Sequence, residues 1–153
     1  MQLNCRFVEK AMKRTSFAKD ICPVARSVEA VGDWWALLIV RDALTGKRRF
    51  GEFEKSLGVA KNILAVRLKK LVADGVMELV PASDGSSYQE YALTERGRGL
   101  LPVIVALGQW GRARSQFKMV DRKKGEPVRL ELRSEVGRKL APDDVLLVSA
   151  SEE

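Results

Sequence analysis

The chain has 153 residues, 46% of them hydrophobic, which is enough for one compact domain with its own core and a modest appendage. Its net charge of +7 favours an anionic partner, and the absence of histidine excludes the usual Ser-His-Asp and Cys-His catalysis, so we expect no enzyme, metal or cofactor. The two cysteines are too few for a disulfide framework, no apolar run is long enough to span a membrane, and the start of the chain lacks a secretory leader pattern, which together favour the cytoplasm.

Two helices are predicted in the first third of the chain. Proline suits the first position of a helix, so Pro23 marks a start, with Cys22 as the N-cap residue and an end near Val31. Asp33 can cap a second helix, whose apolar residues recur at helical spacing up to Gly46. We expect this second helix to lie in the core.

Two further helices are predicted over residues 49–57 and 60–74, each ended by a glycine. In the longer one, apolar side chains from Leu64 to Val72 recur at i, i+4, i+7 and i+8 and therefore face the core together. The opposite face should be open to solvent, where it would fit a DNA major groove. That face and its borders carry Lys61, Asn62, Val66, Arg67, Lys69 and Lys70.

A hairpin should follow these helices. Residues 76–80 and 88–93 are rich in strand-forming side chains, and turn-forming residues lie between them. Thr94 then caps another helix, which we expect to kink near Pro102. The broad apolar stripe of this helix consists of Leu100, Val103, Ile104, Leu107, Trp110 and Phe117.

The last part of the chain predicts a small β extension. Apolar and charged residues alternate over residues 127–132, and a short apolar run follows at 145–148. The basic run at residues 122–124 would either touch DNA or stay solvated, and a solvated face is the commoner outcome for such a run.

The predicted order is helix, short helix, tight turn, cationic helix and hairpin, which is the order of a winged helix-turn-helix. The same order would suit a small α+β domain whose cations only solvate its exterior. Winged helices also serve as protein-binding modules, so order alone leaves that alternative open. Residues 46–74 hold eight cationic side chains against three acidic ones, which favours the DNA-binding interpretation.

A series of short segments, spread over roughly residues 20–112, resembles the HxlR family of regulators. These segments are CPV (22–24), VGDWWALLIVR (31–41), RRFGEF (48–53), LAVRL (64–68), ADG (73–75), EYALT (90–94), GLLPV (99–103) and WG (110–111). The resemblance implies a homodimeric winged-helix repressor or activator that binds double-stranded DNA at a dyad-symmetric operator. It also implies that the N-terminal helix and the helix after the wing form the dimer interface.

The expected fold class is therefore α+β: a winged helix-turn-helix with extra N- and C-terminal dimerisation helices and a small C-terminal β extension. We divide the chain into an N-terminal arm or helix (residues 1–20), the HxlR-type domain (21–117) and the extension (118–153).

The apolar stripe after the wing supports a dimer independently of the resemblance. One small domain has too little core to cover Val103, Leu107, Trp110 and Phe117 together, whereas a partner subunit would bury them. The alternative is that this helix packs back across its own core through both edges of the stripe.

The DNA contacts divide into backbone contacts and base contacts. Arg48 and Arg49 precede the short helix, where cationic side chains can meet phosphate, although either arginine could simply be solvated. In the wing, Ser86 can bond phosphate, and Tyr88 stands where the family often has arginine.

On the cationic helix, the polar side chains have the chemistry that base edges need. Asn62 suits adenine, Val66 suits a thymine methyl group, and Arg67 or Lys69 suits guanine or phosphate. Ala65 and Val66 stand where the family is commonly polar, so we expect either a different sequence specificity or a weaker direct readout of bases.

Cys22 is the most reactive group expected in the chain. At the N-cap it faces the positive end of a helix dipole, with Arg26 one turn further on, which favours the thiolate. The resemblance implies that a cysteine at this position senses electrophiles or oxidants, and a small ligand at the dimer cleft is a second means of control. The alternative is a small buried hydrophobe. A Cys22-dependent enzyme is a weaker alternative, because the sequence offers no base to activate the thiol.

Overall fold

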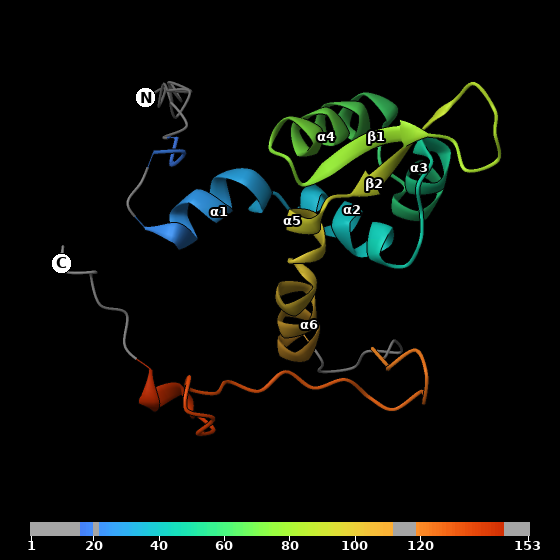
Figure 1. The fold of residues 1–153 in the computed structure, drawn as a ribbon. Coiled ribbons are helices and arrows are strands. Elements are labelled where there is room, and N and C mark those ends of the chain that lie inside the picture. The colour runs from blue at the N-terminus through green and yellow to red at the C-terminus, as the bar shows by residue number, and fades with distance from the viewer. Residues whose placement is uncertain (1–15, 20–21, 112–118, 146–153) are drawn as a thin grey trace, which may run out of the picture.

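The computed structural model describes residues 16–19, 22–111 and 119–145. Helices come first, a hairpin follows, and two more helices lead into the C-terminal extension (Figure 1). The elements are α1 (Pro23–Val31), α2 (Trp34–Leu44), α3 (Phe50–Leu57), α4 (Lys61–Ala73), β1 (Met77–Pro81), β2 (Gln89–Leu93), α5 (Glu95–Arg98), α6 (Leu101–Trp110) and the 3₁₀ turn η1 (Pro142–Asp144). The predicted α+β winged-helix fold class is confirmed.

The first two helices begin where the sequence places their caps. Pro23 occupies the first turn of α1, and Cys22 is its extended N-cap residue. The Oδ1 atom of Asp33 accepts a hydrogen bond from the backbone N–H of Ala36 at 3.1 Å, which satisfies one of the free donors at the start of α2. Both predicted helices are confirmed, and α2 crosses the core as expected.

A tight turn joins α3 to α4. Gly58 ends α3 in the left-handed conformation with φ of +61°, which most side chains would oppose. Phe53 is fully buried on the inner face of α3, and Val59 buries its side chain in the turn itself. Because Phe53 and Val59 are both buried in the core, their packing holds α3 and α4 at a fixed angle to each other.

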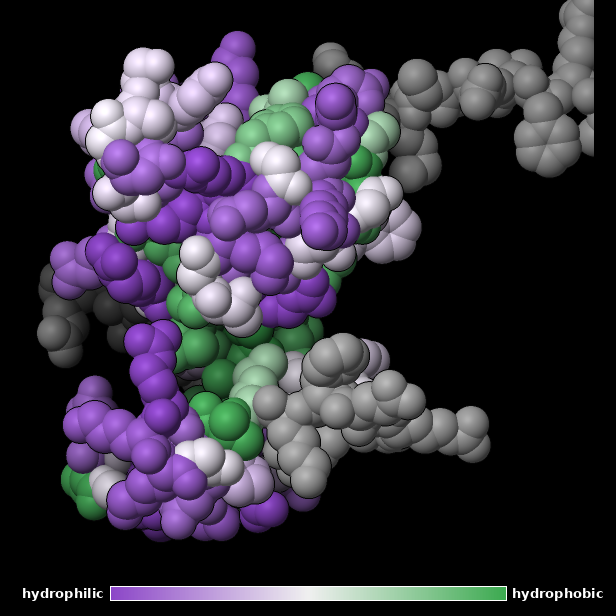
Figure 2. Space-filling view, turned by 90° about the vertical axis from the view of Figure 1, so that its right-hand side faces the viewer, coloured by the Kyte–Doolittle hydropathy of each residue, from purple (hydrophilic) through white to green (hydrophobic). Residues whose placement is uncertain are grey.

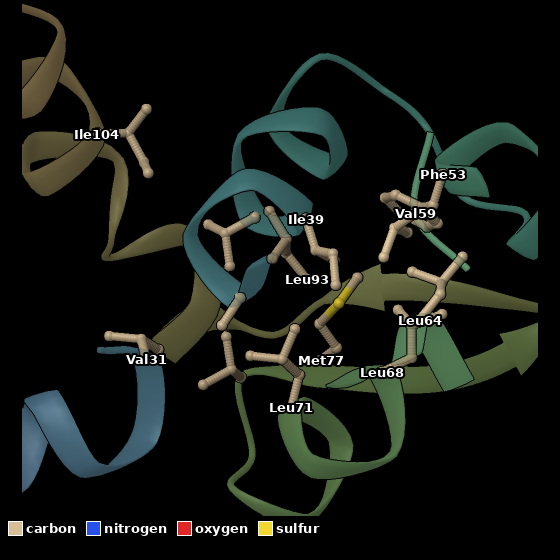
Figure 3. Packing of buried hydrophobic residues seen from close by; sticks show 13 residues of the cluster. Val31, Ile39, Phe53, Val59, Leu64, Leu68, Leu71, Met77, Leu93 and Ile104 are labelled. Atoms are coloured by element: carbon tan, nitrogen blue, oxygen red, sulfur yellow. The ribbon is translucent and has the colours of Figure 1, made fainter. Parts of the chain in front are cut away.

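The core lies between α2, α4 and the inner side of the hairpin (Figure 3). Ile39 of α2 and Leu68 of α4 are completely buried, and Met77 of β1 packs against the same cluster. Burying one such side chain stabilises the fold by roughly 1.5–3 kcal/mol, so this cluster supplies much of the driving force for folding. Val31 at the end of α1 and Ile104 of α6 join the cluster from its edge.

The hairpin pairs β1 with β2 in antiparallel register from Met77 opposite Leu93 to Pro81 opposite Gln89. The outer edge of β2 is partly covered, because the backbone N–H of Tyr91 donates to the carbonyl of Arg48 at 2.8 Å. The loop before α3 is thereby tied to the hairpin, and the tip of the hairpin projects from the body as a wing (Figure 1).

The helix after the hairpin is broken rather than kinked near Pro102. Thr94 caps α5 as predicted, with its hydroxyl oxygen accepting from the N–H of Gly97 at 3.1 Å. α5 ends at Arg98, and α6 starts at Leu101 with Pro102 in its first turn. Within a continuous helix, the ring of Pro102 would clash with the carbonyl four residues earlier, which belongs to Arg98, so the break falls there.

α6 projects away from the body, and the C-terminal extension runs beneath it (Figure 1). The side-chain amide of Gln109 exchanges two hydrogen bonds with the backbone of Leu130 and attaches the extension to α6. The predicted β extension takes a weaker form, since residues 119–145 contain only two isolated bridges, Val120 with Pro127 and Arg133 with Lys139. Among the described residues, no strand lies beside the alternating residues 127–132, so they do not form a β-ladder.

Some predictions fall on other parts of the chain. The N-terminal arm lies outside the described residues except for residues 16–19, and so does the predicted run at 145–148 except for its first residue. Among the helices that the structure describes, none has the length and apolar character needed to cross a bilayer.

Candidate nucleic-acid interface

α4 presents one open face to solvent, as its periodicity predicts. Leu64, Leu68 and Leu71 are buried on the inner side, and their burial fixes the rotation of the helix. The side chains on the outer side are exposed, including the apolar Val66, which is 60% exposed. The exposed face carries Lys61, Asn62, Ala65, Val66 and Lys69.

Two cations predicted to contact DNA from α4 have partners within the chain. Arg67 Nη2 lies 2.9 Å from Asp33 Oδ2, on the carboxylate that also caps α2. Lys70 Nζ lies 2.6 Å from Asp74 Oδ2, one turn further along α4. Arg67 therefore holds α4 against the start of α2, and both cations lie at the border of the open face rather than at its centre.

Arg48 and Arg49 meet a buried carboxylate on the hairpin. Arg48 Nε lies 2.9 Å from Glu90 Oε2, and Arg49 Nε lies 3.3 Å from Glu90 Oε1. The hydroxyl of Ser83 also donates to Glu90 Oε1 at 3.0 Å. Glu90 is only 2% exposed, so its negative charge is held inside the protein by two guanidinium groups and one hydroxyl.

The outer side of this cluster reaches the wing tip. Arg49 Nη2 forms an ion pair with Asp84 Oδ2, and the other carboxylate oxygen of Asp84 accepts from the backbone N–H of Ser86 at 3.0 Å. The hydrogen bond from Arg49 lowers the pKa of Asp84 far below its ordinary value. We name Arg48, Arg49, Asp84 and Glu90 the arginine cluster; it joins the start of α3 to the hairpin.

The start of α3 is held from the opposite side by Glu52. Its Oε2 atom accepts from the backbone N–H groups of Arg48 and Arg49 at 2.7 and 2.8 Å. These two bonds lower the pKa of Glu52 below its ordinary value. The backbone of the two arginines is therefore fixed before any ligand arrives, while about half of each side chain stays exposed.

The sequence alone did not reveal the acidic half of the cluster. Glu90 and Arg49 are 41 positions apart, and Asp84 and Arg49 are 35 apart, so no local periodicity connects them. The sequence offered two separate signals for this cluster: an acidic residue inside a predicted strand and, far from it in the chain, a pair of adjacent arginines.

The two predicted contact residues of the wing differ in exposure. At the wing tip, Tyr88 is 74% exposed and Ser86 is half-buried.

A second exposed surface is apolar and lies on α1 and α6. Trp110 is 89% exposed, the most extreme case among the large apolar side chains of the helices. On the side of the molecule that it shows, Figure 2 has hydrophobic residues between the polar surface above and the polar extension below. We use the name α1–α6 surface for the exposed apolar side chains of α1, α6 and the start of α2, which are Val24, Val28, Trp34, Leu101, Val103, Leu107 and Trp110. The predicted interface residue Phe117 lies outside the described residues.

The predicted thiol and a pocket that was not predicted both involve α1. Cys22 is half-buried at the start of α1. A shallow pocket is lined by Ser27, Ala30, Val31, Val76, Arg96 and Leu100. In the part of the chain that the structure describes, no group of acidic or cysteine side chains is arranged to hold a metal ion. Thiol sensing and ligand binding stay predictions at this point.

Comparison with known families accounts for this arrangement. The model of the HxlR-like helix-turn-helix family matches residues 30–119, which include α2 to α6 and the whole arginine cluster. The chain belongs to the HxlR-like helix-turn-helix family. The resemblance inferred from the sequence is confirmed. Relatives of this HxlR-like chain are named as HTH-type transcriptional regulators.

One such relative, an uncharacterised HTH-type transcriptional regulator of Mycobacterium bovis, is 42% identical over 107 residues, which are 70% of this chain and 65% of the relative. Another, YybR of Bacillus subtilis, is 31% identical over 61% of this chain and 75% of its own length. The chain thus spans slightly less than two thirds of the mycobacterial relative.

Solved structures share the fold. The crystal structure of PA1607, described as a candidate transcription factor, matches with a TM-score of 0.82 and 50% identity and covers 90% of this chain and 100% of its own. The redox regulator HypR in its oxidised form matches with a TM-score of 0.55 and 29% identity, covering 63% of this chain and 100% of its own. The likeness to PA1607 therefore extends beyond the part of the chain that HypR covers.

The buried carboxylate of Glu90 should make stability depend on pH. Burial alone raises the pKa of Glu90, but the Ser83 hydroxyl and the two arginines outweigh it, so the pKa lies below its ordinary value of 4.5. A lowered pKa stabilises the folded state above the ordinary value, and that stabilisation is lost as pH falls through the lowered one. In Glu90→Gln, the urea midpoint should be lower at neutral pH and should change less below about pH 5.

The measurement is urea unfolding at fixed protein concentration from about pH 7 to about pH 3. Glu135→Gln, which removes an exposed carboxylate of the extension, is the matched control and should follow the wild type. Identical pH profiles for Glu90→Gln and the wild type would contradict this account.

Proposed function

We propose that this protein is a transcription regulator, not an enzyme, that binds double-stranded DNA as a homodimer. The observation that carries the proposal is the open face of α4, which presents Lys61, Asn62, Val66 and Lys69 to solvent in a fold that also carries two half-exposed arginines and a wing. A helix fills a major groove of B-DNA, while a flanking wing can follow the backbone.

The chemistry of the open face fits base recognition. The side-chain amide of Asn62 can donate to and accept from the edge of adenine, and the exposed Val66 offers an apolar contact to a thymine methyl group. Lys61 and Lys69 supply positive charge for phosphate or guanine. Arg67 and Lys70, which have partners in the chain, help to hold α4 in place.

The backbone contacts would come from the two ends of the arginine cluster. Arg48 and Arg49 are about half exposed, so their guanidinium groups can reach a phosphate while Glu90 holds them in position. From the wing, the exposed Tyr88 ring would contact the DNA backbone, whereas the Ser86 hydroxyl oxygen is buried and would need a change at the wing tip to reach it.

The α1–α6 surface supports the homodimer. Side chains such as Leu107 and Trp110 would stay in contact with water in a monomer, and large exposed apolar side chains gathered on one helix often mark a protein interface. Pairing two copies through a twofold axis would present two α4 helices to half-sites about one helical turn apart, roughly 34 Å.

Cys22 supports a thiol-sensing role. It caps α1, and α1 contributes to the surface through which the copies would pair, so a modified thiol would shift the geometry of the dimer. A redox regulator among the structural relatives is described in both oxidised and reduced forms. A small ligand in the shallow pocket beside α1 would act on the same helix.

The DNA-binding proposal predicts different effects for two α4 residues. Asn62→Ala should reduce the preference for the native duplex by about 1–3 kcal/mol, because it removes a base contact. Lys61→Ala should weaken binding to every duplex equally and reduce the salt slope by about one per protomer. Fluorescence anisotropy with the gene's own upstream DNA and a scrambled duplex, at several salt concentrations, measures both.

Lys124→Ala, which removes an exposed cation of the extension, is the control and should change neither property. Equal, steeply salt-dependent binding to both duplexes would leave only nonspecific affinity. No binding at any salt concentration would favour a winged helix that recruits protein instead.

The homodimer depends on Trp110. Trp110→Ala should cost about 2 kcal/mol or more of association free energy, because it removes a large aromatic anchor, and should raise the dimer Kd about thirtyfold. Sedimentation equilibrium over a concentration series measures the change. Tyr88→Ala, which removes another exposed aromatic ring far from this surface, is the control. A monomeric wild type, or an unchanged Kd for Trp110→Ala, would contradict the interface.

Thiol sensing is tested by oxidation of the DNA-binding protein. Diamide takes up two hydrogen atoms as it joins two thiols in a disulfide, so it should link the Cys22 thiols of the two copies and release the wild type from its native duplex, while Cys22→Ser, which lacks this thiol, should stay bound. Cys5→Ser keeps Cys22 and should respond like the wild type. A Cys22→Ser variant that diamide still releases would place the sensitive group elsewhere.

A further inference from the structure

We propose that Asp84 holds, in the free protein, the guanidinium group of Arg49 that a DNA phosphate takes over in the complex. Asp84, at the wing tip, would then compete with a DNA phosphate for the guanidinium group of Arg49. This inference rests on the proposed DNA binding and adds to it a residue that weakens affinity.

The two carboxylates that contact Arg49 differ in exposure. Glu90, which lies 3.3 Å from Arg49 Nε, has a side chain only 3% exposed and serves as a permanent anchor. Asp84, which contacts Nη2, has a side chain 50% exposed. Water and other anions can therefore reach the Asp84 side of Arg49 but not the Glu90 side. The outer ion pair is the exchangeable one.

Asp84 is held ready for this role by the wing itself. Its Oδ1 atom accepts from the backbone N–H of Ser86, and the adjacent Gly85 turns the tip with φ of +75°. The lowered pKa of Asp84 keeps its carboxylate ionised at neutral pH. The carboxylate is therefore charged when it contacts Arg49.

A phosphate can replace this carboxylate because the two anions present the same pair of oxygens to a guanidinium fork. An exposed ion pair contributes little free energy, so the exchange costs little compared with the phosphate contact that it opens. Asp84 would also repel the DNA backbone if it stayed in place. The wing tip should therefore turn outwards when Arg49 engages DNA, while Glu90 keeps the base of the cluster unchanged.

A double-mutant cycle tests the exchange. Asp84→Asn keeps the acceptor for the Ser86 N–H but removes the charge, and should tighten binding to native and scrambled duplexes alike by about two- to fivefold. In the Arg49→Gln background the same substitution should give only the small gain that comes from removing one negative charge near DNA, because no guanidinium remains to be released. Fluorescence anisotropy at a fixed, moderate salt concentration measures all four proteins.

Glu78→Gln is the matched control, since it removes one negative charge from an exposed position of the same hairpin. A gain for Asp84→Asn that is no larger than the Glu78→Gln gain, or that persists undiminished with Arg49→Gln, would show that Asp84 acts only as a long-range charge and would overturn the exchange alone. Weaker binding by Asp84→Asn would show that the pair stays closed on DNA, which also overturns it. Binding by none of the proteins would overturn the proposed DNA binding as well.

Discussion

The burial of one stripe of leucines on α4 is the constraint on which the rest of the site depends. Leu64, Leu68 and Leu71 are at most 1% exposed, so the helix cannot rotate without bringing apolar surface into water. Because successive residues are about 100° apart, this single constraint also decides which side chains point outwards. Asn62 and Val66 face solvent as a consequence of core packing, whatever they bind.

The arginine cluster sets the second relation in the site, between α3 and the wing. Burying the charge of Glu90 is costly, and two guanidinium groups with one hydroxyl offset that cost rather than produce a large net gain. Instead, these ion pairs fix the position of the wing relative to α3. The wing cannot move away from α3 without leaving a buried carboxylate uncompensated, which makes the base of the hairpin rigid while its tip remains exposed.

Local signals in the sequence were sufficient for most of the fold. Asp33 and Gly58 act within one helical turn, so their caps could be identified from neighbouring residues. Pro102 also acts locally, but it ends the preceding helix at Arg98 rather than bending it, because the clash falls on the carbonyl four residues earlier. The alternating residues of the extension indicated strands, yet a strand forms only where another backbone is available to pair with it.

The ion pairs could not be predicted in the same way, since the long, flexible side chain of an arginine or lysine can reach any acid that the fold brings near it. This matters for the electrostatics of the site. Residues 46–74 carry most of the excess positive charge, but Arg48, Arg49, Arg67 and Lys70 all lie in ion pairs with acids of the same chain. The attraction of one protomer for DNA is therefore weaker than the charge count suggests.

Lys61 and Lys69 stay exposed, yet a few lysines give only modest affinity at physiological salt. In the proposed homodimer, the second α4 would bind at the high effective concentration set by the first, which multiplies affinity without adding cations. In the proposed dimer, the apolar surface on α6 would thus matter as much for DNA binding as the charges on α4. An effector that alters the pairing through α1 would control DNA affinity without touching the groove-facing residues.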